Sequence, residues 1–281
     1  MSQVTIDADS FRAFEAAGWE EKADPYHRFF GPITSLIIEP LLDAAEIGAG
    51  TSALDVATGP GYVAASAAER GASVVGTDIA TAMVVLAREL NPGIEFRQAD
   101  AENLPFADGA FDSVAGNFVL PHLGRPERAV AECARVLAPG GKIVLSMWDA
   151  PDQNRLFGVL TEAVSTAGAP PANDVPPGPP FFRFSSDEAL SALLAAAGFE
   201  QVEVRGLSFT HRLFRADELW SGLVGGTVRM SALVAGQGEE MRRRIHAAFD
   251  RIVSEYMVGG ILNIPVSVKV ASGRKPEGVS M

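Results

Sequence analysis

The chain of 281 residues has a single cysteine and no long apolar run. One thiol cannot form an intrachain disulfide, and the helical pattern around Cys133 predicts a small buried side chain there. The N-terminal residues MSQVTIDADSFRAF are polar and acidic and contain no signal-peptide core. No stretch approaches the roughly 20 apolar residues of a membrane span. We therefore expect a cytoplasmic protein that does not act at a membrane.

Positive charge is also scarce, because 35 acidic residues face 23 basic ones and the formal net charge is -12. Such a field repels a phosphate backbone, whereas nucleic-acid binding needs clustered Lys and Arg. The densest basic run, 242–244, follows two glutamates in a helical pattern and is interpreted as a solvated face. Nucleic acid is therefore not expected as a partner.

Several catalytic signatures are missing. The sequence has no His/Cys cluster at zinc spacing, no G-x-S-x-G elbow and no G-x-x-x-x-G-K-[ST] phosphate loop. We expect no metal ion. The 47% of hydrophobic residues is enough for a sizeable core.

Apolar periodicity divides the chain into three parts. Residues 1–50 are predicted to form a helical arm, and residues 51–148 a cofactor-binding core in which short β-branched runs alternate with helices. The five strands expected in this core are SALDVAT, SVVGTDI, IEFRQAD, FDSVAGNFVL and KIVLSMW. Strands that alternate with helices and are apolar on both faces predict an α/β, doubly wound, Rossmann-like sheet that is mostly parallel.

The remaining part, 149–281, is expected to complete a sheet of seven strands with QVEVRGLSFTHRL and ILNIPVSVKVASGRK. Between those two strands, 216–258 is predicted to be a helical insertion. An exposed apolar face on its helices would allow two copies of the chain to form a homodimer. Residues 149–184 contain PPANDVPPGPPFFRF, which is too rich in proline and glycine for a regular element. Two interpretations of this segment are equally supported: a plain connector and a lid over the active site.

The segment LDVATGPG, at the turn from the first strand into the first helix, carries the clearest chemical signal. Gly59 and Gly61 permit a tight turn and leave no side chain between the backbone and a ligand. Asp55 is costly to bury unless donors bind it. Its charge would repel the pyrophosphate of NAD but would favour a ligand with a cationic amine and a sulfonium. A role for Asp55 in capping a local turn is the alternative.

Two further acids end the next strands. Asp78 stands where an acidic side chain meets a ribose diol in such folds, and Asp100 could accept a hydrogen bond from an adenine amino group. Each acid alone could be a helix cap, but three acids at three successive strand ends indicate a nucleoside cofactor.

Together these motifs resemble class I S-adenosylmethionine-dependent methyltransferases, near the ubiquinone/menaquinone-biosynthesis type and its small-molecule relatives. LDVATGPG, GTDIATAM, QADAENLPF and FDSV…ARVLAPGGKIVLS follow in the family's order over about a third of the chain. The resemblance implies that Asp55, Ala57, Gly59 and Gly61 line the methionine half of S-adenosylmethionine. It also implies contacts to the nucleoside half and the amine from Asp78, Ile79, Met83, Asp100, Ala101, Glu102 and Asn117.

In this family N-terminal residues often close over the cofactor, which makes Trp19 and Tyr26 candidates, although both could be packing aromatics. A general base would come from His122, just past the fourth strand, or from His27 on the arm. A structural role is the alternative for each histidine.

We expect a methyltransferase that acts on a small hydrophobic or aromatic molecule, with O- or C-methylation favoured. Two alternatives stay open. An NAD(P)-dependent oxidoreductase would leave Asp55 and Asp100 unexplained, and a catalytically inactive cofactor-binding protein could share the fold.

Overall fold

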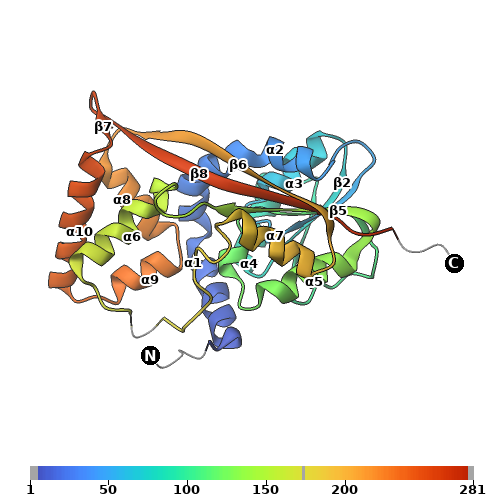
Figure 1. The fold of residues 1–281 in the computed structure, drawn as a ribbon, viewed down its shortest axis with the longest axis horizontal. Coiled ribbons are helices and arrows are strands. Elements are labelled where there is room, and N and C mark those ends of the chain that lie inside the picture. Colours follow the sequence, from blue (N-terminus) through green and yellow to red (C-terminus); the bar gives the residue numbers. More distant parts are fainter. Residues whose placement is uncertain (1–5, 173–174, 278–281) are drawn as a thin grey trace.

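The computed structural model describes residues 6–172 and 175–277. Its centre is a sheet in the order β3-β2-β1-β4-β5-β8-β6 (Figure 1). The parallel strands are β1 (Ser52–Val56), β2 (Ser73–Asp78), β3 (Glu95–Gln98), β4 (Phe111–Gly116) and β5 (Leu137–Trp148). β8 (Ile261–Arg274) runs antiparallel between β5 and β6 (Glu200–Leu213). The expected doubly wound, mostly parallel sheet is confirmed.

One additional strand was not expected. β7 (Met257–Val258) pairs with the start of β8, although the sequence pattern placed these residues in the helical insertion. The prediction is wrong here because Gly259 and Gly260, both at positive φ, form the two-residue turn of a β-hairpin.

Four helices flank the strands of the core. They are α3 (Tyr62–Glu69), α4 (Thr81–Leu90), α5 (Pro126–Val136) and α7 (Asp187–Ala196). Ser186 caps α7, because its hydroxyl accepts a hydrogen bond from the backbone N–H of Ala189 at 3.2 Å. Cys133 is buried in α5 as predicted, and burial raises the pKa of its thiol to about 12.

The N-terminal arm is one long helix, α1 (Ala8–Thr34), followed by a 3₁₀ turn (Ser35–Ile37) and α2 (Ile38–Ala44). Asp7 caps α1 by accepting from the backbone N–H groups of Asp9 and Ser10. The buried residues of α1 include a stripe at four-residue spacing, namely Phe11, Glu15, Trp19 and Ala23. The acidic side chain of Glu15 therefore lies in the protein interior.

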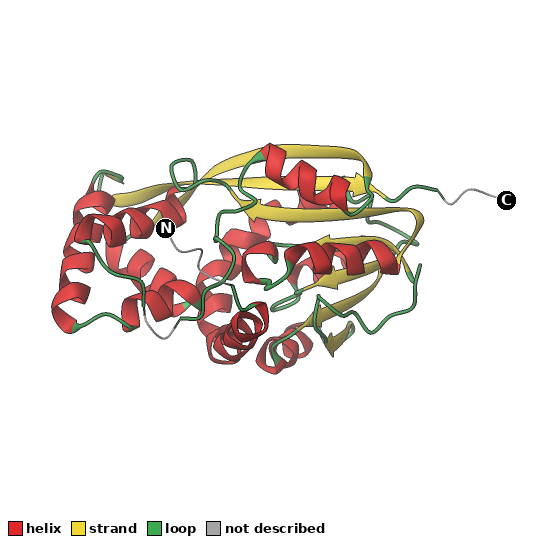
Figure 2. Cartoon of the chain, turned by 60° about the horizontal axis from the view of Figure 1, so that its bottom comes forward, coloured by secondary structure: helices red, strands yellow, loops and turns green. Residues whose placement is uncertain are grey.

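The longest strands, β6 and β8, extend past the rest of the sheet, and a cluster of helices packs where they extend (Figures 1 and 2). The cluster comprises α6 (Arg155–Ala167), α8 (Ala216–Gly225), α9 (Arg229–Ala235) and α10 (Glu239–Ser254). Within the described residues, no helix is long and apolar enough to cross a membrane.

Helix α6 corrects the expectation for residues 149–184. The proline-rich part beyond residue 169 has no regular element in the described residues, but the first half contains these 13 helical residues. Asn154 caps the start of α6 and Gly168, at a φ of 67°, ends it. This stretch is apolar and capped at both ends, and the prolines lie beyond it.

Candidate active site

A cavity lies at the carboxyl ends of β1, β2 and β4, where the strand order reverses, and α1 covers it. Ligands bind at this point in open α/β sheets. Most of the site residues predicted from the sequence line the cavity. These are Asp55, Ala57, Gly59, Asp78, Ile79, Met83, Asp100, Ala101, Glu102, Asn117 and His122. Gly61 and His27 are not among the lining residues.

The loop after β1 has an unusual backbone. Ala57 has a φ of 54°, a conformation that costs energy for a residue with a side chain, and Gly59 has a φ of 53°. A Cβ on Gly59 would meet no atom closer than Tyr26 Cε1 at 4.0 Å. The backbone of Gly59 is therefore open to the cavity.

Gly61 packs closely against other parts of the protein. Its φ is 85°, and a Cβ there would lie 2.8 Å from Phe96 Cζ and 2.9 Å from Asn91 Nδ2. The close packing of β3 and the end of α4 against the loop requires a glycine here. Gly61 thus allows the tight turn on the side of the loop that packs against the protein.

Asp55 is a buried acid with an unused oxygen. It is 1% exposed, and its Oδ2 accepts from Thr58 Oγ1 at 2.5 Å and from the N–H of Ala64 at 3.1 Å. Its Oδ1 has no hydrogen-bond partner in the described residues. Burial raises the pKa of Asp55 to about 7. An unpartnered buried carboxylate oxygen is costly, so a ligand with a cationic donor would be stabilised there.

Asp78, at the end of β2, links the loop to the next helix. Its carboxylate accepts from the N–H of Gly59 at 2.9 Å and from the N–H of Ala80 at 3.0 Å. Burial raises its pKa to about 6. Each oxygen retains a lone pair for a ligand hydroxyl.

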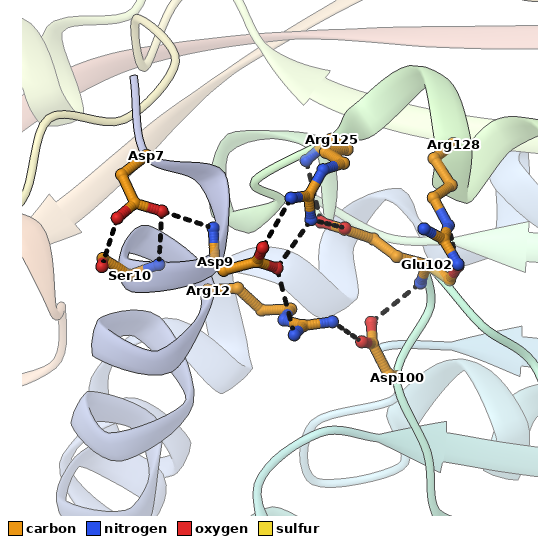
Figure 3. Close-up of polar contacts among 8 residues, drawn as sticks. All are labelled: Asp7, Asp9, Ser10, Arg12, Asp100, Glu102, Arg125 and Arg128. Atoms are coloured by element: carbon orange, nitrogen blue, oxygen red, sulfur yellow. Dashed lines mark hydrogen bonds and ion pairs between the residues drawn. The ribbon is translucent and has the colours of Figure 1, made fainter. Parts of the chain in front are cut away.

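Asp100 belongs to an ion-pair network that ties the arm to the loop after β3 (Figure 3). Arg12 on α1 donates to Asp100 at 2.5 Å, and Asp100 also accepts from the N–H of Glu102 at 2.8 Å. Arg125 bridges Asp9 and the buried Glu102. The carboxylate of Glu102 is therefore held in place by Arg125. The spacing of these residues along the chain gave no sign of the network.

We call the residues at the strand ends, Asp55, Ala57, Gly59, Asp78 and Asp100, the sheet wall. Opposite it is the cover wall, contributed by α1, the 3₁₀ turn Leu120–His122, the segment before residue 184 and α9. Its residues are Glu15, Trp19, His122, Phe181 and Arg229. Sequence reasoning identified His122 and Trp19 but missed Glu15 and Arg229.

His122 is held by Glu15. Its Nδ1 lies 2.9 Å from Glu15 Oε2, which also accepts from Trp19 Nε1 at 3.2 Å. Because a carboxylate only accepts, the proton of this bond is on Nδ1, and Nε2 is the acceptor of the neutral ring. The rings of Trp19 and Phe181 pack edge-on against His122. Glu15 is 2% exposed, and its Oε1 has no partner in the described residues.

The two other aromatic candidates and the second histidine are also placed. Trp19 and Tyr26 both line the cavity, and their ring centres lie 5.4 Å apart in an edge-to-face arrangement. Each ring therefore both faces the cavity and packs against the other. His27 lies on α1, where its ring stacks on Tyr62 and its Nδ1 bonds the Tyr62 hydroxyl.

Asn117, after β4, uses its side chain within the protein. Its Oδ1 accepts from Ser146 Oγ at 2.6 Å and its Nδ2 donates to the carbonyl of Thr34 at 3.4 Å. These bonds hold the side chain in place, while the residue lines the cavity. In residues 6–172 and 175–277, no cluster of His, Cys, Asp or Glu could hold a metal ion.

Comparison with known proteins agrees with this geometry. A family model described as a methyltransferase domain matches residues 54–145. The demethylmenaquinone methyltransferase of Renibacterium salmoninarum is 31% identical over 191 residues, which cover 64% of this chain and 81% of that protein.

Two solved structures share the fold. The YcgJ protein of Bacillus subtilis has a TM-score of 0.56 at 20% identity and covers 86% of this chain and 98% of its own. Phosphoethanolamine N-methyltransferase 2 of Haemonchus contortus, solved with S-adenosylhomocysteine, has a TM-score of 0.57 at 18% identity, over 95% of this chain and 60% of its own. The strand-end acids, the glycine loop and these relatives lead to one conclusion: the chain belongs to the class I S-adenosylmethionine-dependent methyltransferases.

Proposed function

We propose that this enzyme transfers a methyl group to an oxygen or an acidic carbon of a small aromatic or hydrophobic acceptor. One observation carries the proposal: a single cavity joins the sheet wall to a cover wall on which a buried carboxylate orients His122. The name of the Renibacterium salmoninarum relative gives demethylmenaquinone as its acceptor. This supports an acceptor of the same aromatic class.

The sheet wall would hold S-adenosylmethionine, which supplies an electrophilic methyl group when bound. The free Oδ1 of Asp55 suits its cationic amine, with Ala57, Gly59 and the Asn117 backbone beside it. Asp78 would accept from the ribose hydroxyls. Ile79 and Met83 would flank the adenine, whose edge Asp100 and Ala101 would meet.

Two predicted residues receive supporting roles in this proposal. Gly61 would keep the turn tight against Phe96. Glu102, bonded to Arg125, would hold the Asp100 loop in place.

His122 would accept the acceptor's proton at Nε2, and Glu15 would fix the ring and stabilise the imidazolium that forms. A carboxylate that holds the other ring nitrogen is a recurrent way to orient a histidine base. His27, which is not a cavity residue, is not proposed as a base.

The sheet wall also favours this cofactor over NAD(P). Asp55 lies at the glycine loop, where its charge would repel a pyrophosphate, whereas Asp78 suits the ribose of either cofactor.

The test uses S-adenosylmethionine with a labelled methyl group and a panel of phenols and enolisable compounds. We expect label to be transferred by the wild type and lost in His122→Asn, whose amide can replace Nδ1 but not Nε2. Normal transfer by His122→Asn would remove His122 as the base. Failure of the wild type to label any member of the panel while it binds S-adenosylhomocysteine would contradict the proposed acceptor class.

A further inference from the structure

Arg229, the first residue of α9, lines the cavity from the cover wall. Its guanidinium lies 5.1 Å from the centre of the Phe11 ring and 5.7 Å from that of Phe181. Burial lowers the pKa of Arg229. The side chain thus places a poorly solvated positive charge among aromatic rings.

The bonding of Arg229 is incomplete. Its Nη1 donates to the carbonyl of Pro179 at 3.0 Å and to that of Pro121 at 3.4 Å. Within the described residues, no carboxylate lies within ion-pair distance of it, and neither Nε nor Nη2 has a partner. Glu15 favours the charged form of Arg229 only through longer-range electrostatic attraction. A half-buried cation without a paired anion loses part of its hydration uncompensated, so an anionic ligand would be stabilised there.

The other cation of the cavity, Arg12, differs from Arg229. Arg12 forms ion pairs with Asp100 at 2.5 Å and with Asp9 at 3.3 Å. Its charge is already balanced by the protein. Arg229 therefore has the donors that a ligand could use.

Arg229 is also close to the proposed base. One of its two carbonyl partners belongs to Pro121, the residue before His122, and Phe181 packs against both His122 and Arg229. An aromatic ring in this part of the cavity could face the histidine at one end and the guanidinium at another. The planar fork of Arg matches a carboxylate, with two parallel hydrogen bonds.

We propose that Arg229 is a binding site for a carboxylate of the methyl acceptor, which makes the acceptor a hydroxylated aromatic acid; this rests on the proposed function. The two carbonyl bonds of Nη1 fix the guanidinium, and Nε and Nη2 take the carboxylate. A purely structural role, in which Arg229 ties α9 to residues 121 and 179, would use Nη1 alone.

The test measures binding to the protein saturated with S-adenosylhomocysteine. Benzoate is the probe, and benzamide, similar in shape but neutral, is its control. Trp19 and Trp148 line the cavity, so tryptophan fluorescence reports occupancy. The variants are Arg229→Gln, Arg229→Lys and, as a charge-matched control on an exposed residue, Arg205→Gln.

We expect Arg229→Gln to weaken benzoate binding by about tenfold or more, because charge-assisted hydrogen bonds are lost. Benzamide binding, and the benzoate affinity of Arg205→Gln, should not change. Arg229→Lys keeps the positive charge but loses the planar guanidinium, so it should also weaken benzoate binding. This variant provides the test if Arg229→Gln does not fold.

Equal benzoate affinity in the wild type and in the Arg229 variants would overturn this inference and leave the proposed function intact. So would equal binding of benzoate and benzamide by the wild type. Failure of the wild type to bind S-adenosylhomocysteine would instead overturn the proposed function, and the inference with it.

Discussion

The sheet wall and the cover wall of the cavity differ in how far apart their residues lie along the chain. The residues of the sheet wall fall between Asp55 and Asp100 and follow successive strands. The cover wall combines residues as distant as Glu15, His122 and Arg229. A local strand–turn–helix pattern builds the first wall, whereas only the packing of α1 and α9 on the core builds the second. Cofactor affinity should therefore depend on one wall and acceptor chemistry on the other.

The largest effect is expected from Gly59→Val. Its branched side chain would fill the space that the open backbone leaves for the cofactor, so affinity for S-adenosylhomocysteine should fall on the order of 100-fold, or about 2.7 kcal/mol. Gly168→Val is the matched control, because Gly168 also has a positive φ with open space around it but lies at the end of α6. Calorimetry should find the loss of affinity in the first variant only. An equal loss in both would assign the effect to backbone strain.

Glu15→Gln tests the cover wall. It removes the charge that holds His122, so turnover should fall about 10- to 100-fold, the value of a hydrogen bond to a charged group. The affinity for S-adenosylhomocysteine should not change. Glu21→Gln, on an exposed part of the same helix, is the control and should turn over normally. A loss of cofactor affinity in Glu15→Gln would contradict the separation of the two walls.

Acidification should weaken cofactor binding through the sheet wall. Burial raises the pKa of Asp55 to about 7 and that of Asp78 to about 6, and the cationic ligand needs their charged forms. Affinity should be constant above pH 7 and fall as pH drops through 7 and 6, by up to about tenfold per unit for each proton taken up. Asp78→Asn should remove the lower part of this dependence in calorimetric titrations.

The same two acids affect folding stability with the opposite sign. Their folded pKa values lie above the ordinary value of 3.8, so the folded apoprotein binds more protons than the unfolded chain between about pH 4 and 7. Their contribution to the free energy of unfolding is therefore lost as pH rises through the folded pKa values. Acid that both stabilised the apoprotein and strengthened cofactor binding would contradict this assignment.

The smallest effect is expected from His27→Ala. Its ring stacks on Tyr62 and does not line the cavity, so turnover should stay within about twofold of the wild type. A steady-state assay beside His122→Asn checks this. A large loss in His27→Ala would return His27 to consideration as the base.

The same contrast explains what the sequence could reveal. Strands, core helices and the sheet wall were predictable because the apolar periodicity and the strand-end acids lie close together along the chain. Hydrogen bonds such as that between Glu15 and His122, 107 residues apart, are set by tertiary packing. One signal was present: Glu15 shares a four-residue repeat with Phe11 and Trp19, which places an acid on an otherwise apolar stripe.

Other differences also have local causes. Gly61 could not be distinguished from Gly59 by spacing, because the contact with Phe96 comes from β3, which lies two strands away from β1 in the sheet. The two glycines after Val258 could have indicated the β7 hairpin, and the Asn154 cap with Gly168 could have indicated α6.

Thermal unfolding of the wild type, Asp78→Asn and His122→Asn with S-adenosylhomocysteine tests the division between the two walls most directly. At a hundred times its dissociation constant the ligand adds about 2.7 kcal/mol to the folded state, a shift of roughly 5 °C at this length. At one ligand concentration, chosen for the wild type, we expect that shift in the wild type and in His122→Asn and a clearly smaller one in Asp78→Asn. An unchanged shift in Asp78→Asn, or its loss in His122→Asn, would contradict the account.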